Sequence, residues 1–179
     1  MAQIVTKKAR KEYKCCKCGE TINPSDTYKL LQMMYQKPRR ACHKCNFKRS
    51  ETTTSEYLGM IWDLQDDTEI NSQEDIEILV SDLETLRDET QDKLENMPEQ
   101  LQYSENGELL QERVDLLEEA ISEMEEIEWP NEDTTKDELE LDKEDYKDVK
   151  KYNEAIQKKL EEHEEEISNQ VLEILGSLG

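Results

Sequence analysis

Histidine, glycine, proline and long apolar runs are all scarce in this sequence of 179 residues. It holds two His, five Gly and four Pro, and its hydrophobic residues make up 34% against 38% charged residues. Few turn residues argue against a sheet with many reversals, and the low hydrophobic content argues against a large globular core. No apolar run approaches the ~18 residues of a membrane span, so we expect a cytoplasmic protein that enters no membrane.

The sequence also lacks recognisable catalytic residues and motifs. His43 lies between two cysteines, and His163 falls on an apolar heptad position. Neither histidine has an evident nucleophile to activate, and the chain contains no Gly-rich phosphate loop and no HExxH motif. We therefore expect a protein without catalytic activity.

Charge is abundant but unevenly distributed. Residues 1–50 contain thirteen Lys or Arg and three Asp or Glu, whereas residues 51–179 contain ten and forty-two, within a net charge of −22. Such asymmetry is typical of parts that bind different partners, or that bind each other.

All five cysteines lie between positions 15 and 45, and four of them form two CxxC pairs. Two such pairs supply the four soft ligands that a structural zinc ion takes in a tetrahedral site. Cys15, Cys18, Cys42 and Cys45 are therefore predicted to bind one zinc ion, which holds the fold and performs no catalysis. Cys16 is interpreted as a thiol that does not bind the zinc. Two alternative ligand sets remain, one with Cys16 in place of Cys15 and one with His43 in place of Cys42.

The twenty-three residues between the two pairs leave room for a hairpin. Residues 26–35 are rich in strand-forming residues, and residues 37–40 are predicted to form the turn that returns to the second pair. We expect residues 1–50 to form a basic zinc ribbon. Its first fourteen residues are predicted to be a basic arm.

Residues 15–45 carry a resemblance to a known group of proteins. Cys15 together with the run CKCGETINPSDTY, followed by RRACHKC, fits the pattern CxxCGxxIxxGDxY with a distant RxxCxxC, apart from Ser25 in place of glycine. This resembles small zinc ribbons encoded by bacteriophages and, more loosely, zinc fingers of the poly-ADP-ribose polymerase type, which have a histidine among their ligands. The resemblance implies the same four zinc ligands and a hairpin bearing Ile22, Asp26 and Tyr28.

The rest of the chain is predicted to be helical. Residues 51–71 are interpreted as a linker and a short docking helix, which starts at a capping box of Thr53 and Glu56. Residues 72–179 form an acidic coiled-coil region. Its first helix starts at Ser72, ends before Pro98 and pairs antiparallel with a second helix that follows a turn at Asn106-Gly107.

A third, longer helix is expected from a capping box at Thr135 and Glu138 to Gly176. Its C-terminal half is expected to reach beyond the shorter helices, so that it folds back on them only in part or forms a homodimer through residues 137–175. The predicted fold class is thus mostly α: an N-terminal zinc ribbon followed by an elongated acidic helical hairpin or three-helix coiled coil.

Two sets of charged residues are candidates for binding. Basic side chains with interleaved aromatics suit phosphate contact and base stacking. The candidate nucleic-acid contacts are Lys14, Lys17, Lys37, Arg39, Arg40, Lys44, Lys48 and Arg49. Rows of carboxylates suit a basic protein surface. The candidate protein-partner contacts are Glu118, Glu119, Glu123, Glu125, Glu126, Glu161, Glu162, Glu165 and Glu166.

These observations favour a non-catalytic accessory or regulatory protein, whose ribbon contacts nucleic acid or a nucleic-acid-bound machine while its helices bind a protein. One alternative is a phage-encoded inhibitor whose acidic helices mimic nucleic acid in a host enzyme. Another is a structural oligomer in which the helices only assemble ribbons, and their charges are simply solvated faces of a coiled coil.

Overall fold

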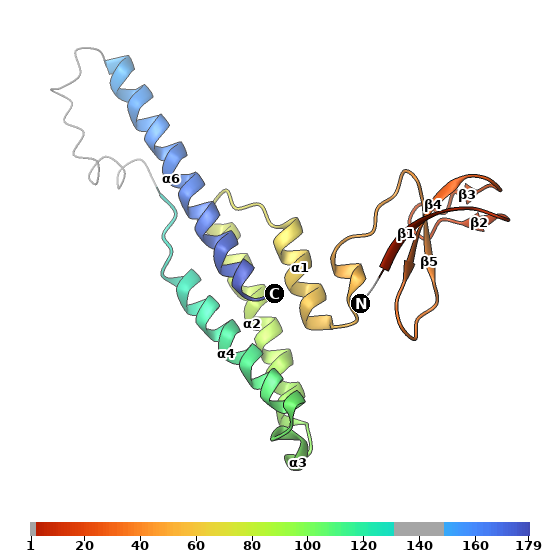
Figure 1. Cartoon of the computed structure of the whole chain (residues 1–179). Coiled ribbons are helices and arrows are strands. Elements are labelled where there is room, and N and C mark those ends of the chain that lie inside the picture. Colours follow the sequence, from red (N-terminus) through yellow and green to blue (C-terminus); the bar gives the residue numbers. More distant parts are fainter. Residues whose placement is uncertain (1–2, 131–148) are drawn as a thin grey trace. The chain divides into compact units, whose positions relative to one another are not determined.

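The chain folds into a small β-rich part with a cysteine cluster, followed by a larger helical part. The computed structural model describes residues 3–130 and 149–179 (Figure 1). Two compact units follow one another along the chain: an N-terminal unit, Met1–Asp66, and a C-terminal unit, Asp67–Gly179. We describe each unit by itself.

The N-terminal unit is built on a three-stranded antiparallel sheet in the order β1-β4-β5. Its strands are β1 (Gln3–Lys8), β4 (Thr27–Gln32) and β5 (Arg39–Cys42), and a two-residue pair of β2 (Tyr13–Lys14) with β3 (Thr21–Ile22) lies between β1 and β4 in sequence. Tyr28, Leu30 and Leu31 of β4 are buried, and Tyr28 and Leu30 lie in the core of the unit beside Ile22. The predicted hairpin between the two cysteine pairs is therefore confirmed as β4 and β5.

Two sequence-based interpretations of this unit are wrong. The predicted basic arm is β1 over much of its length, and β1 pairs with β4 from Gln3↔Gln32 to Lys8↔Thr27. The sequence of β1, QIVTKK, does not alternate apolar and polar residues, so it carries no strand signal that separates it from a basic tail. The predicted turn at residues 37–40 starts earlier, because Arg39 and Arg40 already pair with Leu31 and Leu30 of β4.

A short helical segment completes the N-terminal unit. The 3-10 turn η1 (Ser50–Thr52) leads into α1 (Glu56–Asp67), which buries Tyr57 and Ile61. A short helix is thus present where one was predicted, but its predicted cap is wrong. The side chain of Ser55 accepts the N–H of Leu58 at 3.3 Å, and Thr53 instead accepts the N–H of Ser55. The Ser55 hydroxyl, which lies directly before the first helical turn, therefore caps the helix in place of the Thr53 hydroxyl.

The C-terminal unit begins with a helical hairpin. Helix α2 (Gln73–Glu95) is capped by Ser72, whose side chain accepts the N–H of Asp75 as predicted. It pairs with α4 (Glu105–Glu125) through the short α3 (Glu99–Gln102). The side chain of Gln73, at the start of α2, bonds the Ile127 carbonyl and the Trp129 N–H beyond the end of α4, so the two helices are antiparallel.

The predicted heptad seam is the core of this hairpin. The buried positions of α2 are Ile76, Leu79, Leu83, Leu86, Thr90 and Leu94. Thr90 interrupts the apolar series in sequence but occupies a seam position, where its hydroxyl donates to the Leu86 carbonyl at 2.7 Å. An internal bond of this kind satisfies a buried hydroxyl without a partner from another helix. The facing positions of α4 are Val114, Leu117, Ala120, Ile121 and Met124.

Helix α6 (Val149–Ser177) is the longest described element and packs along α4 (Figure 1). Its C-terminal half does not extend beyond the shorter helices, which corrects the expectation above. Ile167, Val171 and Leu175 are buried there, and Ser168 donates a 3.1 Å hydrogen bond to the Ile70 carbonyl. The predicted capping box at Thr135 and Glu138 lies outside the described residues.

The predicted turn at Asn106-Gly107 is also wrong, because both residues lie in the first turn of α4. The chain reverses earlier, through α3 and Tyr103. Gly107 is buried for a spatial reason: a Cβ atom there would lie 2.1 Å from the Gln102 carbonyl oxygen. Glycine at this position allows α3 to pack directly on α4.

Gly107→Ala should therefore destabilise the C-terminal unit. Alanine would gain about 1 kcal/mol in helix propensity, but the overlap with the Gln102 backbone should reverse this and give a net loss of about 1–3 kcal/mol. Urea unfolding followed by far-UV circular dichroism measures the change. Gly176→Ala is the matched control, because a Cβ atom at Gly176 meets nothing within 4 Å and should leave stability equal or higher. Equal behaviour of the two variants would contradict the packing argument.

Candidate metal centre and charged surfaces

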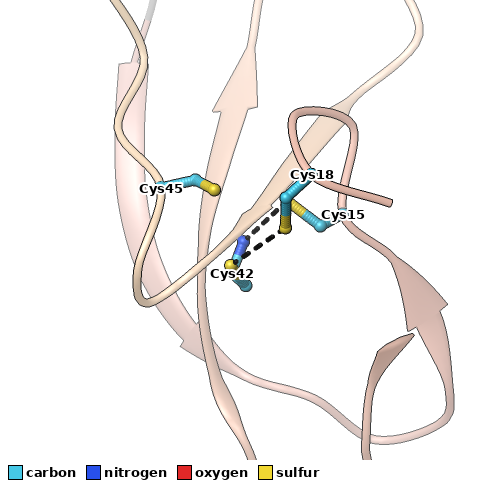
Figure 2. A group of neighbouring side chains, drawn as sticks. All are labelled: Cys15, Cys18, Cys42 and Cys45. Carbon is cyan, nitrogen blue, oxygen red and sulfur yellow. Dashed lines mark hydrogen bonds between the residues drawn. The ribbon is translucent and has the colours of Figure 1, made fainter. Parts of the chain in front are cut away.

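The four cysteines of the two CxxC pairs converge in the N-terminal unit. The sulfur atoms of Cys15, Cys18, Cys42 and Cys45 all lie within 4.8 Å of one another, and the pair Cys18–Cys42 is 3.7 Å apart. Figure 2 shows the four side chains pointing toward a common centre. Sulfurs at such spacings can share one metal ion. The prediction that these four residues come together is thus confirmed as a cluster able to hold a metal.

Backbone hydrogen bonds shape the first pair into a tight loop after β2. The Cys15 N–H donates to the Glu20 carbonyl at 2.9 Å, and the Gly19 N–H donates to the Cys15 carbonyl at 3.1 Å. Gly19 has φ of +75°, a conformation that a residue with a Cβ atom adopts only with strain. The second pair starts at the last residue of β5, and the Cys45 N–H donates to the Cys42 carbonyl at 3.1 Å.

The sheet holds the two loops together. The Cys16 N–H donates to the Arg40 carbonyl of β5 at 2.8 Å, and the Cys42 N–H points at the Cys15 sulfur at 3.3 Å (Figure 2). Cys15 and Cys42 are buried in the same core as Tyr28, whereas Cys18 is exposed. The cluster is therefore continuous with the apolar core on one side and open to solvent on the other.

The thiols of the cluster have unequal acidities. Burial disfavours the Cys15 thiolate, but backbone N–H groups of Cys18, Cys42 and Lys17 outweigh burial and lower the pKa of Cys15 to about 6. Hydrogen bonding with Cys42 and Cys18 raises the pKa of Cys45 to about 12. A metal ion that takes all four sulfurs as thiolates must therefore displace protons, so binding should weaken as the pH falls.

The other two candidate ligands stay outside the cluster. Cys16 is exposed, and its backbone N–H rather than its thiol makes the described contact with β5. His43 is exposed and does not belong to the group of four. The structure thus favours the two CxxC pairs over the ligand sets that include Cys16 or His43.

Two of the predicted nucleic-acid contacts are bound to one carboxylate. Glu51 of η1 accepts the Lys17 ammonium, the Arg39 guanidinium at 2.5 Å and the Lys48 N–H at 3.0 Å. Partial burial opposes ionisation of Glu51, but Lys17, Lys48 and Arg39 outweigh it and lower the pKa. Glu51 thus ties the first cysteine loop and β5 to the segment before α1, and the sequence gives no periodic signal for it.

Most of the other predicted basic contacts also have partners within the N-terminal unit. The contacts join Lys44 to Glu20, Lys48 to Asp63, Arg40 to the Tyr13 ring and Arg49 to the Trp62 ring. Lys14 and Lys37 differ. Both are exposed, and neither has an acidic partner among the described residues. Lys7, Lys8 and Arg10, on or just after β1, share this property.

The predicted partner-binding glutamates separate into different surfaces of the C-terminal unit. Glu119, Glu123 and Glu126 line one groove between α4 and α6, together with Glu128, which belongs to the same acidic stretch, and Glu173, which the sequence pattern did not indicate. The spacing i, i+4, i+7 of the first three is a helical-face signal, whereas Glu173 becomes a neighbour only through the packing of α6.

The remaining candidates do not line this groove. Glu161 and Glu165 line a smaller hollow beside Trp129. Glu162 pairs with Lys159 and Lys158, which lower its pKa. Glu118, Glu125 and Glu166 line neither hollow.

Comparison of the chain with protein-family models, with curated proteins and with solved structures finds no match. The resemblance of residues 15–45 to bacteriophage ribbons therefore stays a prediction. Of the helices in the described ranges, none combines the length and the apolar character needed to cross a membrane.

Removal of one cluster thiol should abolish metal binding. We expect one tightly bound metal ion per chain, lost in Cys42→Ser because a hydroxyl replaces a buried thiolate ligand. Elemental analysis after dialysis measures the number of metal ions bound per chain. Cys16→Ser is the matched control and should keep the full metal content. Loss of metal in Cys16→Ser but not in Cys42→Ser would contradict the ligand set.

Glu51→Gln should destabilise the N-terminal unit at pH 7 by about 1–3 kcal/mol, because two cations lose their common partner. The lowered pKa means that this contribution is present above the ordinary glutamate pKa of ~4.3 and is lost as the pH falls through the lower folded-state value. Thermal unfolding from pH 8 to pH 5 should therefore show a constant difference. The exposed Glu12→Gln should change stability by less than about 0.5 kcal/mol; a similar loss there would show that Glu51 has no special role.

Proposed function

We propose that the cysteine cluster binds one structural zinc ion and that the N-terminal unit is a zinc ribbon. A tetrahedral site with Zn–S distances of about 2.3 Å has sulfurs about 3.8 Å apart, and the Cys18–Cys42 separation of 3.7 Å agrees with it. Four protein thiolates leave no open position for water or substrate. The ion would stabilise the fold, and the cysteines would only ligate it.

The protein acts as a non-catalytic accessory or regulatory protein with two binding surfaces of opposite charge. The observation that carries this proposal is the segregation of charge between the two compact units. The N-terminal unit contains thirteen Lys or Arg and seven Asp or Glu, whereas the C-terminal unit contains ten and thirty-eight. Charges of +6 and −28 attract different ligands and steer their encounter.

The N-terminal unit contacts nucleic acid or a nucleic-acid-bound machine through β1 and β2. Lys7, Lys8, Arg10 and Lys14 are exposed there and lack ion pairs with any described residue, so phosphates can replace their counterions. Tyr13 lies among them under the Arg40 guanidinium. Lys17, Arg39, Lys44 and Lys48, in contrast, already neutralise carboxylates of the same unit and would have to exchange them.

The C-terminal unit binds a protein partner through its carboxylates. A second candidate function uses the same charge: an inhibitor that occupies the nucleic-acid groove of a host enzyme. Excess acid in the C-terminal unit favours both. Competition separates them, because an inhibitor displaces nucleic acid from its target whereas an accessory protein forms a ternary complex. Self-assembly through residues 137–175, measured by analytical ultracentrifugation, would instead support the structural oligomer.

Neutralising the free lysines should weaken nucleic-acid binding more than neutralising the paired ones. In a salt-titrated mobility shift with the full chain, Lys8→Gln with Lys14→Gln should lower the slope of log K against log salt by about 1.8. Lys44→Gln with Lys48→Gln removes the same charge and should lower the slope by clearly less, because both lysines pair with acids.

Absence of any shift by DNA or RNA at low salt would refute the nucleic-acid part of the proposal. Equal effects of the two double variants would refute the assignment to β1 and β2 but leave a general basic surface in place.

A further inference from the structure

The C-terminal unit contains a groove that its own described residues do not fill. The groove lies between α4 and α6 and has a volume of about 800 Å³. Its floor is apolar, with Leu116, Ala120 and Ile127 from α4 and the residues after it, and Ile167 and Ile174 from α6. We call this feature the acidic groove, because its rim consists of the five glutamates described above.

The lining positions follow the period of both helices. On α6 they are His163, Ile167, Gln170, Glu173, Ile174 and Ser177, which recur every three or four residues apart from the adjacent pair Glu173 and Ile174. At 1.5 Å per residue, His163 and Ser177 are about 21 Å apart along the helix axis. The groove is therefore long enough for about four turns of another helix lying along it.

The rim has one sign of charge. Glu119, Glu123, Glu126, Glu128 and Glu173 are all exposed, and none of them forms an ion pair with a described residue. No Lys or Arg lines the groove. Five unneutralised carboxylates around an apolar floor raise the local negative potential, which a cationic ligand would relieve.

Among the described helices, only the start of α6 is basic: residues 149–159 contain four Lys and one Glu. In the same chain this stretch belongs to the helix that lines the groove, so it does not fill the groove. Residues 131–148 contain nine Asp or Glu and three Lys, so their sequence carries the same sign as the groove. The C-terminal unit of a second copy is acidic as well. Nucleic acid is excluded from the groove by its phosphates.

We infer that the acidic groove binds an amphipathic basic helix of a partner protein. Apolar side chains of that helix, spaced by three or four residues, lie on the floor, and its Lys or Arg side chains pair with the glutamates of the rim. The inference rests on the proposed protein-binding function and assigns it a place and a partner chemistry. Glu118, Glu125 and Glu166 then contribute only long-range attraction.

The test uses the full chain and three synthetic peptides of about fourteen residues. The first has Leu at helical spacing and Lys elsewhere, the second has the same composition with the Leu positions scrambled, and the third has Glu in place of Lys. Fluorescence polarisation should show binding of the first peptide at least about tenfold tighter than that of the second, because only the first presents an apolar stripe to the floor.

Variants of the chain then locate the site. Glu119→Gln, Glu123→Gln and Glu173→Gln together should weaken the first peptide about tenfold or more, since three rim charges are lost. The matched control combines Glu77→Gln, Glu89→Gln and Glu166→Gln, which removes equal charge from exposed positions outside the groove. It should change affinity less than about threefold.

A single exposed substitution gives an independent check. Gln170→Lys places a cation on the groove wall and should weaken the first peptide, whereas Asn169→Lys, one position away and outside the lining, should not. Equal effects of the two substitutions, or of the two triple variants, would overturn the groove while leaving a general acidic surface for partners.

Other outcomes separate the inference from the proposal beneath it. Absence of binding by either basic peptide would refute the protein-binding function together with the groove. Dimers that form with rising chain concentration and disappear in the groove triple variant, but not in its control, would assign the groove to a basic segment of a second copy, either its N-terminal unit or the start of its α6, and would overturn the partner helix.

Discussion

Convergence of four sulfurs on one point is the constraint on which the N-terminal unit depends. A unit of this size buries only about 60% of the surface that its unfolded chain exposes, and its sheet core is small. Cys15 and Cys42 belong to that core beside Tyr28 and Leu30. Four thiolates so close together repel one another unless a cation joins them. A metal ion would therefore hold β2, β5 and the two loops in one arrangement, which the hydrophobic effect alone supplies only in part.

Local patterns in the sequence predicted the parts of the fold that local interactions determine. Each CxxC pair by itself, the Ser72 cap and the seam from Ile76 to Leu94 are set by residues near one another in sequence, and the structure contains all three. The meeting of the two pairs across twenty-three residues was predicted from the chemistry of a shared metal ion, not from local structure. Even Thr90, an interruption in the pattern, stays on the seam because its hydroxyl bonds within its own helix.

Features set by contacts across the chain escaped prediction. Residues 3–8 form strand β1 because they pair with the edge of β4. Their sequence alone is equally compatible with a basic tail that forms no strand. Glu51 unites Lys17 and Arg39 from two distant elements. Gly107 reads as a turn residue, yet its role is to make room for the Gln102 backbone. In each case the deciding neighbour lies beyond the window in which sequence periodicity has meaning.

The same distinction bears on how charge becomes function. A total charge records every acid and base, but a side chain that already has an intramolecular partner offers little to a ligand, because the first interaction must be broken. In the N-terminal unit, Glu20, Glu51 and Asp63 take up several of the lysines and arginines that a sequence search selects first. Those that keep their charge unpaired among the described residues include Lys7, Lys8, Arg10 and Lys14, on or near β1 and β2, and Lys37. In the C-terminal unit, the carboxylates around the acidic groove have no cationic partner among the described residues, and they lie beside its apolar floor. A polycation could pair only with the carboxylates. An amphipathic basic helix could pair with the carboxylates and also cover the floor, so the groove favours such a helix.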